Sequence, residues 1–95
     1  MDLTELRQQI DQIDEKILAL FIERMEVSGQ IAQVKQAEGK AVFDPQREKE
    51  KIAEIERLAG EEWRADAKKL YTVLMELSRA YQRRLGVELV WKHSD

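Results

Sequence analysis

Arg24 occupies a position in the chain where an apolar residue is expected. Apolar residues recur at three- and four-residue steps, the pattern of a buried helix face, at Leu3, Leu6, Ile10, Ile13, Ile17, Leu20, Val27, Ile31 and Val34. Arg24 fills the one gap in this row. Because a guanidinium stays charged at any ordinary pH, its burial requires an anionic partner. No carboxylate lies in the row, so the partner comes from another helix or is a bound ligand.

Two further cations lie on the same expected helix. Lys35 follows Arg24 by eleven residues, which places both side chains on one side of the helix. Arg7 precedes Arg24 by seventeen residues and lies about 100° away around the axis. We therefore expect Arg7 to be unable to serve the same pocket from its own chain, whereas it could serve the pocket of a second copy.

Polar residues also accompany the later apolar faces. Asp44, Arg47 and Glu48 cluster within one helical turn, and Glu48 continues an apolar row, so a carboxylate stands where burial is expected. Ser78 and Gln82 are one turn apart at the edge of another apolar face. Together these groups predict one pocket lined by several cations and a few hydrogen-bonding groups, which would bind a small dianion.

Taken singly, most of these residues have an ordinary structural explanation. Glu48 fits an ion pair with Lys51 or Lys49, and Lys35 fits the negative end of a helix dipole. Surface pairing, helix capping or simple helix exposure would account for Arg7, Arg47, Asp44, Ser78 and Gln82. Arg24 is the exception. A purely structural explanation would need an ion pair between subunits, and such a buried pair is costly to desolvate.

The elements that carry these residues are helices, so the fold class is all-α. We expect three helices, from about Asp2 or Leu3 to Ala37, from Asp44-Pro45 to about Ala59, and from about Asp66 to Leu85. Gly39 and Gly60 are suitable left-handed stops, and Asp44-Pro45 is a typical helix start. The predicted inward residues of the second helix are Ile52, Ile55 and Leu58. Those of the third helix are Leu70, Val73, Leu74, Leu77, Tyr81 and Leu85. Residues 1–86 form one domain, followed by a tail over residues 87–95.

The length of the first helix predicts a homodimer. About 35 helical residues form a rod of roughly 50 Å, whereas a compact monomer of 95 residues is about 30 Å across. The apolar row continues to the far end of the rod, so another surface must cover it. A second copy of the chain, forming an intertwined helical dimer, is the simplest partner, and a plain coiled coil is the alternative.

Composition excludes several classes of function. The net charge of -3 argues against general nucleic-acid binding. The chain has no cysteine, and its one histidine, His93, lies in the tail, so thiol chemistry, zinc binding and histidine catalysis are not expected. No apolar run is long enough to span a membrane, and no signal peptide opens the chain. We expect a cytoplasmic protein.

The polar pattern resembles that of a known family, the all-helical AroQ class of chorismate mutase. The similarity covers residues 3–85 and is carried by Leu6-Arg7, Asp11, Asp14, Lys16-Ile17-Leu18, Leu20, Arg24, Lys35, Asp44, Arg47-Glu48, Ser78 and Gln82. The resemblance implies an intertwined dimer of three-helix chains. Each of its two sites would be completed by an arginine of the other subunit.

The resemblance also implies an activity, the conversion of chorismate to prephenate by an intramolecular Claisen rearrangement, without metal or cofactor. Arg24 and the partner's Arg7 would hold the two substrate carboxylates, with Ser78 assisting at one of them. Lys35 and Gln82 would donate hydrogen bonds to the ether oxygen, where negative charge grows as the carbon–oxygen bond breaks.

The remaining cluster would serve the substrate ring. Glu48, with Asp44 nearby, would accept a hydrogen bond from the ring hydroxyl. Arg47 would order these carboxylates and the substrate. Two alternatives stay open, an isochorismate-pyruvate lyase on the same fold and a non-catalytic dimerisation or metabolite-binding module. The chain could also be one domain of a fused enzyme.

Overall fold

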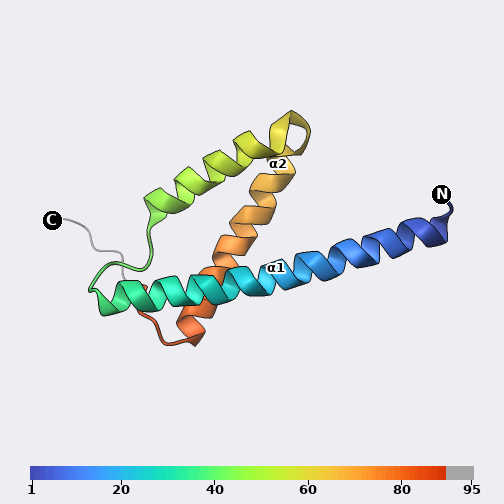
Figure 1. Ribbon diagram of the computed structural model, residues 1–95. Coiled ribbons are helices and arrows are strands. Elements are labelled where there is room, and N and C mark those ends of the chain that lie inside the picture. The colour runs from blue at the N-terminus through green and yellow to red at the C-terminus, as the bar shows by residue number, and fades with distance from the viewer. Residues whose placement is uncertain (90–95) are drawn as a thin grey trace.

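The structure, a computed structural model that describes residues 1–89, consists of two long helices (Figure 1). α1 spans Leu3–Ala37 and α2 spans Pro45–Arg84. The described residues contain no strand, so the all-α prediction is confirmed. None of their helices is both long enough and apolar enough to cross a membrane. The prediction for His93 lies outside the described residues.

α1 begins and ends where capping signals predict. The Asp2 carboxylate caps the first turn by accepting a hydrogen bond from the Glu5 amide at 2.8 Å. After Ala37 the chain turns at Gly39, whose φ of 72° lies in the left-handed region that glycine adopts readily. In this turn a hydrogen bond to Glu38 raises the pKa of Lys40, although both side chains are exposed.

α2 corrects the prediction of three separate helices. Its first part begins at Pro45 behind the Asp44 cap, as predicted, and Gly60 interrupts it with φ 77° and ψ 174°. Helix resumes at once, so there is no loop before Asp66 and the expected third helix is the second arm of α2. A single glycine reverses the chain because this backbone conformation is essentially closed to other residues. We call residues 45–59 the first arm and residues 61–84 the second arm.

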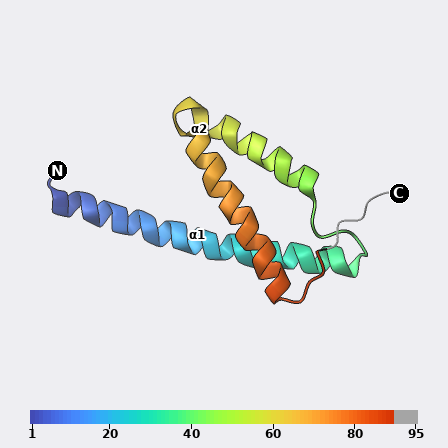
Figure 2. The ribbon, with the colours of Figure 1, turned by 180° about the vertical axis from the view of Figure 1, so that it is seen from behind.

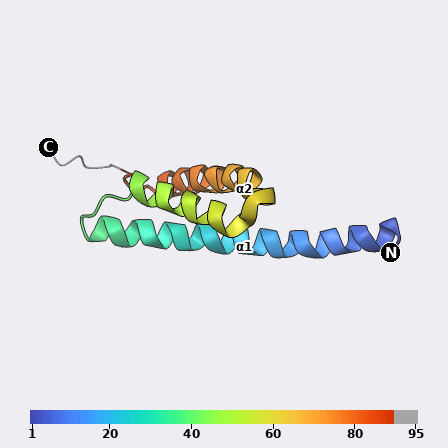
Figure 3. The same cartoon turned by 90° about the horizontal axis from the view of Figure 1, so that it is seen from above.

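The two arms of α2 form a V that lies against the C-terminal half of α1. The first arm leads away from the α1–α2 turn to the apex of the V, and the second arm returns from the apex and crosses α1 (Figures 1 and 2). Seen from above, both arms lie on the same side of α1, and the N-terminal half of α1 extends well beyond them (Figure 3). The structure therefore combines a three-part layered region with a projecting rod.

The core is small and lies near the α1–α2 turn. Ala32 is fully buried and packs with Val42 of the turn and with Val87, just after α2. Leu89 covers this cluster, so the start of the predicted tail packs on the folded domain. Ile55 of the first arm and Met75 of the second arm are also buried. No large side chain among the described residues is fully buried.

Much of the predicted inward face is exposed in the single chain. The apolar row of α1 is exposed at every position, for example by 56% at Ile10 and 64% at Leu20. On α2 the prediction of inward side chains holds for Ile55, but not for Leu58, Leu70, Val73, Leu77 and Leu85, which are exposed. The reason is shape. The radius of gyration is 16.7 Å, against about 12 Å for a compact chain of this length.

Candidate active site

A pocket of about 610 Å³ lies between the C-terminal half of α1, the α1–α2 turn and the two arms of α2. This volume is within the range of small-molecule sites. Its apolar lining consists of Leu20, Val27, Ile31, Val42, Phe43 and Met75. Its polar lining consists of Glu23, Arg24, Ser28, Lys35, Asp44, Arg47, Glu48, Lys51, Ser78, Arg79 and Gln82.

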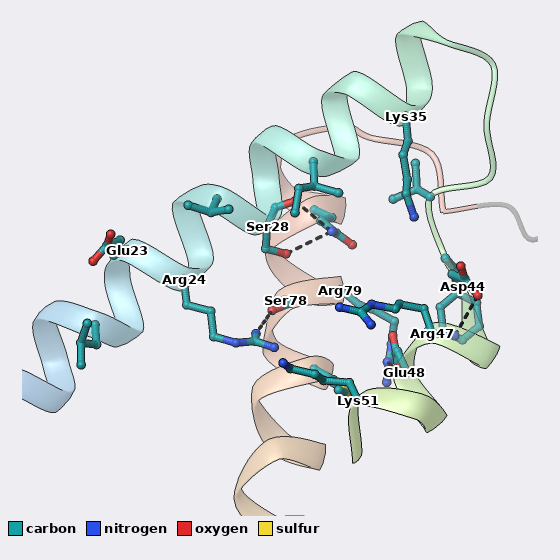
Figure 4. A pocket seen from close by; sticks show the side chains of 17 residues that line it. Glu23, Arg24, Ser28, Lys35, Asp44, Arg47, Glu48, Lys51, Ser78 and Arg79 are labelled. Atoms are coloured by element: carbon teal, nitrogen blue, oxygen red, sulfur yellow. Dashed lines mark hydrogen bonds and ion pairs between the residues drawn. The ribbon is translucent and has the colours of Figure 1, made fainter. Parts of the chain in front are cut away.

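The pocket gathers seven of the eight residues that the sequence singled out as a site. They are Arg24, Lys35, Asp44, Arg47, Glu48, Ser78 and Gln82 (Figure 4). The eighth, Arg7, is exposed on the projecting part of α1 and does not line this pocket. This placement agrees with the angular argument that Arg7 cannot reach the pocket of its own chain. The chemical roles of all eight residues stay predictions.

Arg24 is held by the second arm of α2. Its Nη1 donates a hydrogen bond to Oγ of Ser78 at 3.1 Å (Figure 4). Its guanidinium also lies 5.9 Å from the centre of the Tyr71 ring. Ser78 is buried. The guanidinium is therefore oriented by a neutral hydroxyl and an aromatic face, neither of which neutralises its charge. A ligand carboxylate can do so.

Gln82 also bonds across to α1. Its Nε2 donates to the backbone oxygen and to Oγ of Ser28, both at 3.1 Å. These bonds hold the amide at the pocket wall without involving a charged group. Lys35 extends from the last turn of α1 into the space between α1 and the first arm of α2 (Figure 4). Two hydrogen-bond donors from different helices thus line the same pocket.

The start of α2 presents the acidic and basic cluster. The Asp44 carboxylate accepts from the Arg47 backbone amide at 3.0 Å, so its capping role is confirmed. Glu48 forms an ion pair with Arg79 of the second arm. The ordinary explanation that Glu48 pairs with Lys51 or Lys49 is wrong, because Lys51 instead pairs with Glu54 at 3.3 Å. The fold of α2 brings the Arg79 guanidinium closer than either lysine.

The pocket carries positive charge that no carboxylate of the described residues neutralises. Five cations and three carboxylates line it. Arg79 pairs with Glu48, and Lys51 pairs with Glu54. Among the residues that the structure describes, the other three cations have no carboxylate within ion-pair distance; they are Arg24, Lys35 and Arg47. The charge of this pocket suits a small molecule that carries two or more negative charges.

Sequence reasoning missed four polar residues of the pocket, namely Glu23, Ser28, Lys51 and Arg79. Ser28 had a usable signal, because it lies four residues after Arg24 and seven before Lys35, on the same helix face. Lys51 follows Glu48 by one turn, which also gave a signal. Arg79 had no such signal. Its partner, Glu48, lies on the other arm of α2, and the sequence pattern did not predict that α2 reverses at Gly60.

Comparison with known proteins identifies the family. Residues 6–83 match the family described as chorismate mutase type II. The chain belongs to this family. The match covers most of the chain and includes every residue of the predicted site, which confirms the resemblance and assigns the chain to the chorismate mutases, an isomerase family.

Individual relatives agree with the assignment. A chorismate mutase of Methanocaldococcus jannaschii is 36% identical over 84 residues, which cover 85% of this chain and 84% of that protein. A bifunctional chorismate mutase/prephenate dehydratase of Aquifex aeolicus is 40% identical over 57 residues, or 16% of its length. A T-protein of Haemophilus influenzae is 37% identical over 46 residues, or 12% of its length. No solved structure matched.

Proposed function

We propose that this chain converts chorismate to prephenate as a homodimer with two shared active sites. The observation that carries the proposal is the pocket itself, in which Arg24, Lys35 and Arg47 have no carboxylate partner among the described residues. Chorismate is a dianion with a flexible enolpyruvyl arm, and its rearrangement needs no nucleophile. Family membership supports the same substrate.

The first task of the site is to hold the substrate in a folded conformation. In our proposal Arg24 binds one carboxylate with the help of Ser78, whose hydroxyl already contacts the guanidinium at 3.1 Å. Arg7 of the partner subunit binds the other carboxylate. Fixing both ends brings the reacting carbons together, and orientation of this kind supplies a large share of the rate enhancement.

The second task is to stabilise the charge that develops as the ether bond breaks. We assign Lys35 and Gln82 as donors to the ether oxygen, with Gln82 exchanging its bonds to Ser28 for the substrate. A preorganised donor is typically worth about 3–4 kcal/mol, and an acceleration of about 10⁶ needs some 8 kcal/mol. Two donors together with orientation are therefore sufficient.

The third task is recognition of the ring. Glu48, with Asp44 nearby, accepts a hydrogen bond from the ring hydroxyl in our proposal. The Arg47 guanidinium, which forms no ion pair with a carboxylate among the described residues, binds the substrate. The predicted ordering of Glu48 by Arg47 is not supported, because Glu48 pairs with Arg79. The Asp44 carboxylate also caps α2, so the acidic groups are fixed to the start of a rigid helix. This arrangement supports selective binding of a ring that carries both a hydroxyl and carboxylates.

The projecting half of α1 supports the shared site. Arg7 lies on this half, where the whole apolar row is exposed in one chain. In our proposal the row packs against a second copy and carries Arg7 into that copy's pocket. The location of the protein in the cytoplasm stays a prediction.

The activity is tested with the purified chain and two substrates. We expect loss of chorismate absorbance, with prephenate identified as the product, and no release of pyruvate from isochorismate. Pyruvate release would instead assign a lyase. A correctly folded protein with no turnover of either compound would favour a non-catalytic binding module.

The shared site is tested by mixing two inactive variants, Arg7→Ala and Arg24→Ala. Each homodimer loses one carboxylate ligand in both sites. In a mixed dimer one site keeps both arginines, because it takes Arg24 from one chain and Arg7 from the other. After unfolding and refolding an equal mixture, about a quarter of the sites are intact, so we expect about a quarter of the parental activity. If activity stays at the level of the separate variants, Arg7 does not serve the partner's pocket.

A further inference from the structure

Arg79 is the one pocket cation whose ion-pair partner is a pocket carboxylate. Its Nη1 bonds to Oε1 of Glu48, and the two residues come from opposite arms of α2 (Figure 4). Both side chains are partly buried, with exposed fractions of 24% for Arg79 and 30% for Glu48. A charge-assisted bond in such surroundings is stronger than a surface ion pair.

A second contact fixes the Arg79 guanidinium from another direction. It lies 5.3 Å from the centre of the Phe43 ring, in the turn just before the Asp44 cap. Cation–π attraction and the bond to Glu48 together restrict the guanidinium to one orientation. Three segments of the chain therefore meet at Arg79, namely the α1–α2 turn and both arms of α2.

The Arg79–Glu48 pair also separates two hollows. A second hollow of about 410 Å³ adjoins the pocket and shares Glu48, Met75 and Arg79 with it. Lys49 and Lys68 also line this second hollow. Without Arg79, a lysine on that side would attract the Glu48 carboxylate away from the pocket.

We propose that Arg79 is a positioning residue that keeps the Glu48 carboxylate directed into the pocket. Arg79 occupies Oε1, so Oε2 is left as an acceptor for the ring hydroxyl of the substrate. The inference rests on the proposed function, because it assigns a supporting residue to the same site. Arg79 itself contacts neither the reacting bond nor the substrate carboxylates in this scheme.

The expected kinetic signature is a change in KM. The ring hydroxyl is not part of the bond that forms or breaks, so its hydrogen bond contributes equally before and during the reaction. Arg79→Met keeps a long apolar stem and removes the charge. We expect its KM for chorismate to rise about 10- to 100-fold, with a much smaller change in kcat. Arg79→Lys keeps a cation and should recover much of the loss.

The decisive measurement compares two substrates. With a chorismate analogue that lacks the ring hydroxyl, the parent and Arg79→Met should have the same kcat/KM. In that case the analogue has no hydroxyl that could donate a hydrogen bond to Glu48. Adding Arg79→Met to Glu48→Gln should likewise cause no further loss. Arg83→Met is the matched control, since Arg83 lies one turn further along α2, is exposed and does not line the pocket.

Each alternative outcome overturns the proposal in a different way. Equal losses with both substrates would assign Arg79 a structural role or a direct contact with the substrate. A gain of activity in Arg79→Met would show that Arg79 sequesters Glu48 from the substrate. Unchanged kinetics would remove Arg79 from the site while leaving the proposed function intact. A parent chain inactive on chorismate would overturn both proposals.

Discussion

At the scale of single residues, the contact that each pocket cation makes suggests whether it binds the substrate or supports another side chain. Arg24 is oriented by the neutral Ser78 hydroxyl, so its charge is available to a ligand. The charge of Arg79 is already matched by Glu48. Residue type alone does not make this distinction, because both are arginines on helices that line one pocket. We therefore propose opposite tasks for these two chemically identical side chains.

Gln82→Glu should make activity dependent on acid. In the parent, the Gln82 amide donates at every pH, whereas a carboxyl group donates only when it is protonated. Since the ordinary pKa of a glutamic acid is about 4.3, the variant should lose roughly 100-fold or more near neutral pH. Its activity should rise as the pH falls toward that pKa.

The pH profile of kcat/KM for the Gln82→Glu variant and the parent checks this expectation. Gln82→Ala is the control, because it cannot donate at any pH and should stay inactive throughout. Profiles of the same shape for the parent and the Gln82→Glu variant would remove Gln82 from the role of donor to the ether oxygen.

At the scale of elements, the close crossing of α1 and α2 sets the width of the pocket. Gly29 is buried at this crossing. A Cβ added there would lie 2.9 Å from Cδ1 of Leu85 and 2.9 Å from Cε2 of Tyr81. Tyr81 precedes Gln82, and Gly29 follows Ser28, so the crossing lies beside the hydrogen bonds between Gln82 and Ser28.

Gly29→Ala should therefore lower both stability and activity. Alanine favours a helix by up to about 1 kcal/mol over glycine, but overpacking typically costs 1–3 kcal/mol. Both contacts are to side-chain atoms, and the rigid Tyr81 ring is harder to displace than the flexible Leu85 side chain. We expect a net destabilisation of about 1 kcal/mol, measured by thermal unfolding, together with reduced kcat/KM.

Gln30→Ala is the control for the crossing, because Gln30 is exposed next to Gly29 and its loss should change stability little. A Gly29→Ala variant that melts above the parent would mean that helix propensity outweighs the contact with α2. The crossing would then not limit the pocket.

At the scale of the whole molecule, the single chain exposes more surface than a compact protein of its size. Its accessible surface is 7615 Å², whereas a compact chain of 11.2 kDa exposes about 5,700 Å². The excess includes the apolar row along the projecting half of α1. Exposure of a continuous apolar row of this length is unusual for a monomer and supports the proposed dimer.

Ile13→Glu should convert the proposed dimer into a monomer. Ile13 lies in the exposed row, and a charge buried there without a partner costs several kcal/mol. The mass in solution, measured by light scattering, should fall from twice the chain mass to 11.2 kDa. Activity should fall with it, because Arg7 would no longer reach a second pocket.

Gln8→Glu is the matched control for the dimer, because Gln8 lies on the opposite side of α1 from the apolar row. This variant should keep the mass and activity of the parent. A parent chain that is itself monomeric yet active would contradict the shared site.

The sequence alone determined the local features of this protein. The bounds of α1, the Asp44 cap and the break at Gly60 all followed from helical period and capping chemistry. The exclusion of Arg7 from the pocket of its own chain followed from its angle around a single helix. Period and capping depend on neighbours within a turn or two, so they can be predicted from the residues in order.

Only the tertiary structure decided which polar groups meet. The pairs Arg24–Ser78 and Ser28–Gln82 join residues 54 positions apart, and Glu48–Arg79 joins residues 31 positions apart. These contacts depend on how sharply α2 reverses at Gly60 and on how closely α2 approaches Gly29. No short-range pattern contains either quantity, because each is set by backbone torsion and packing between distant segments.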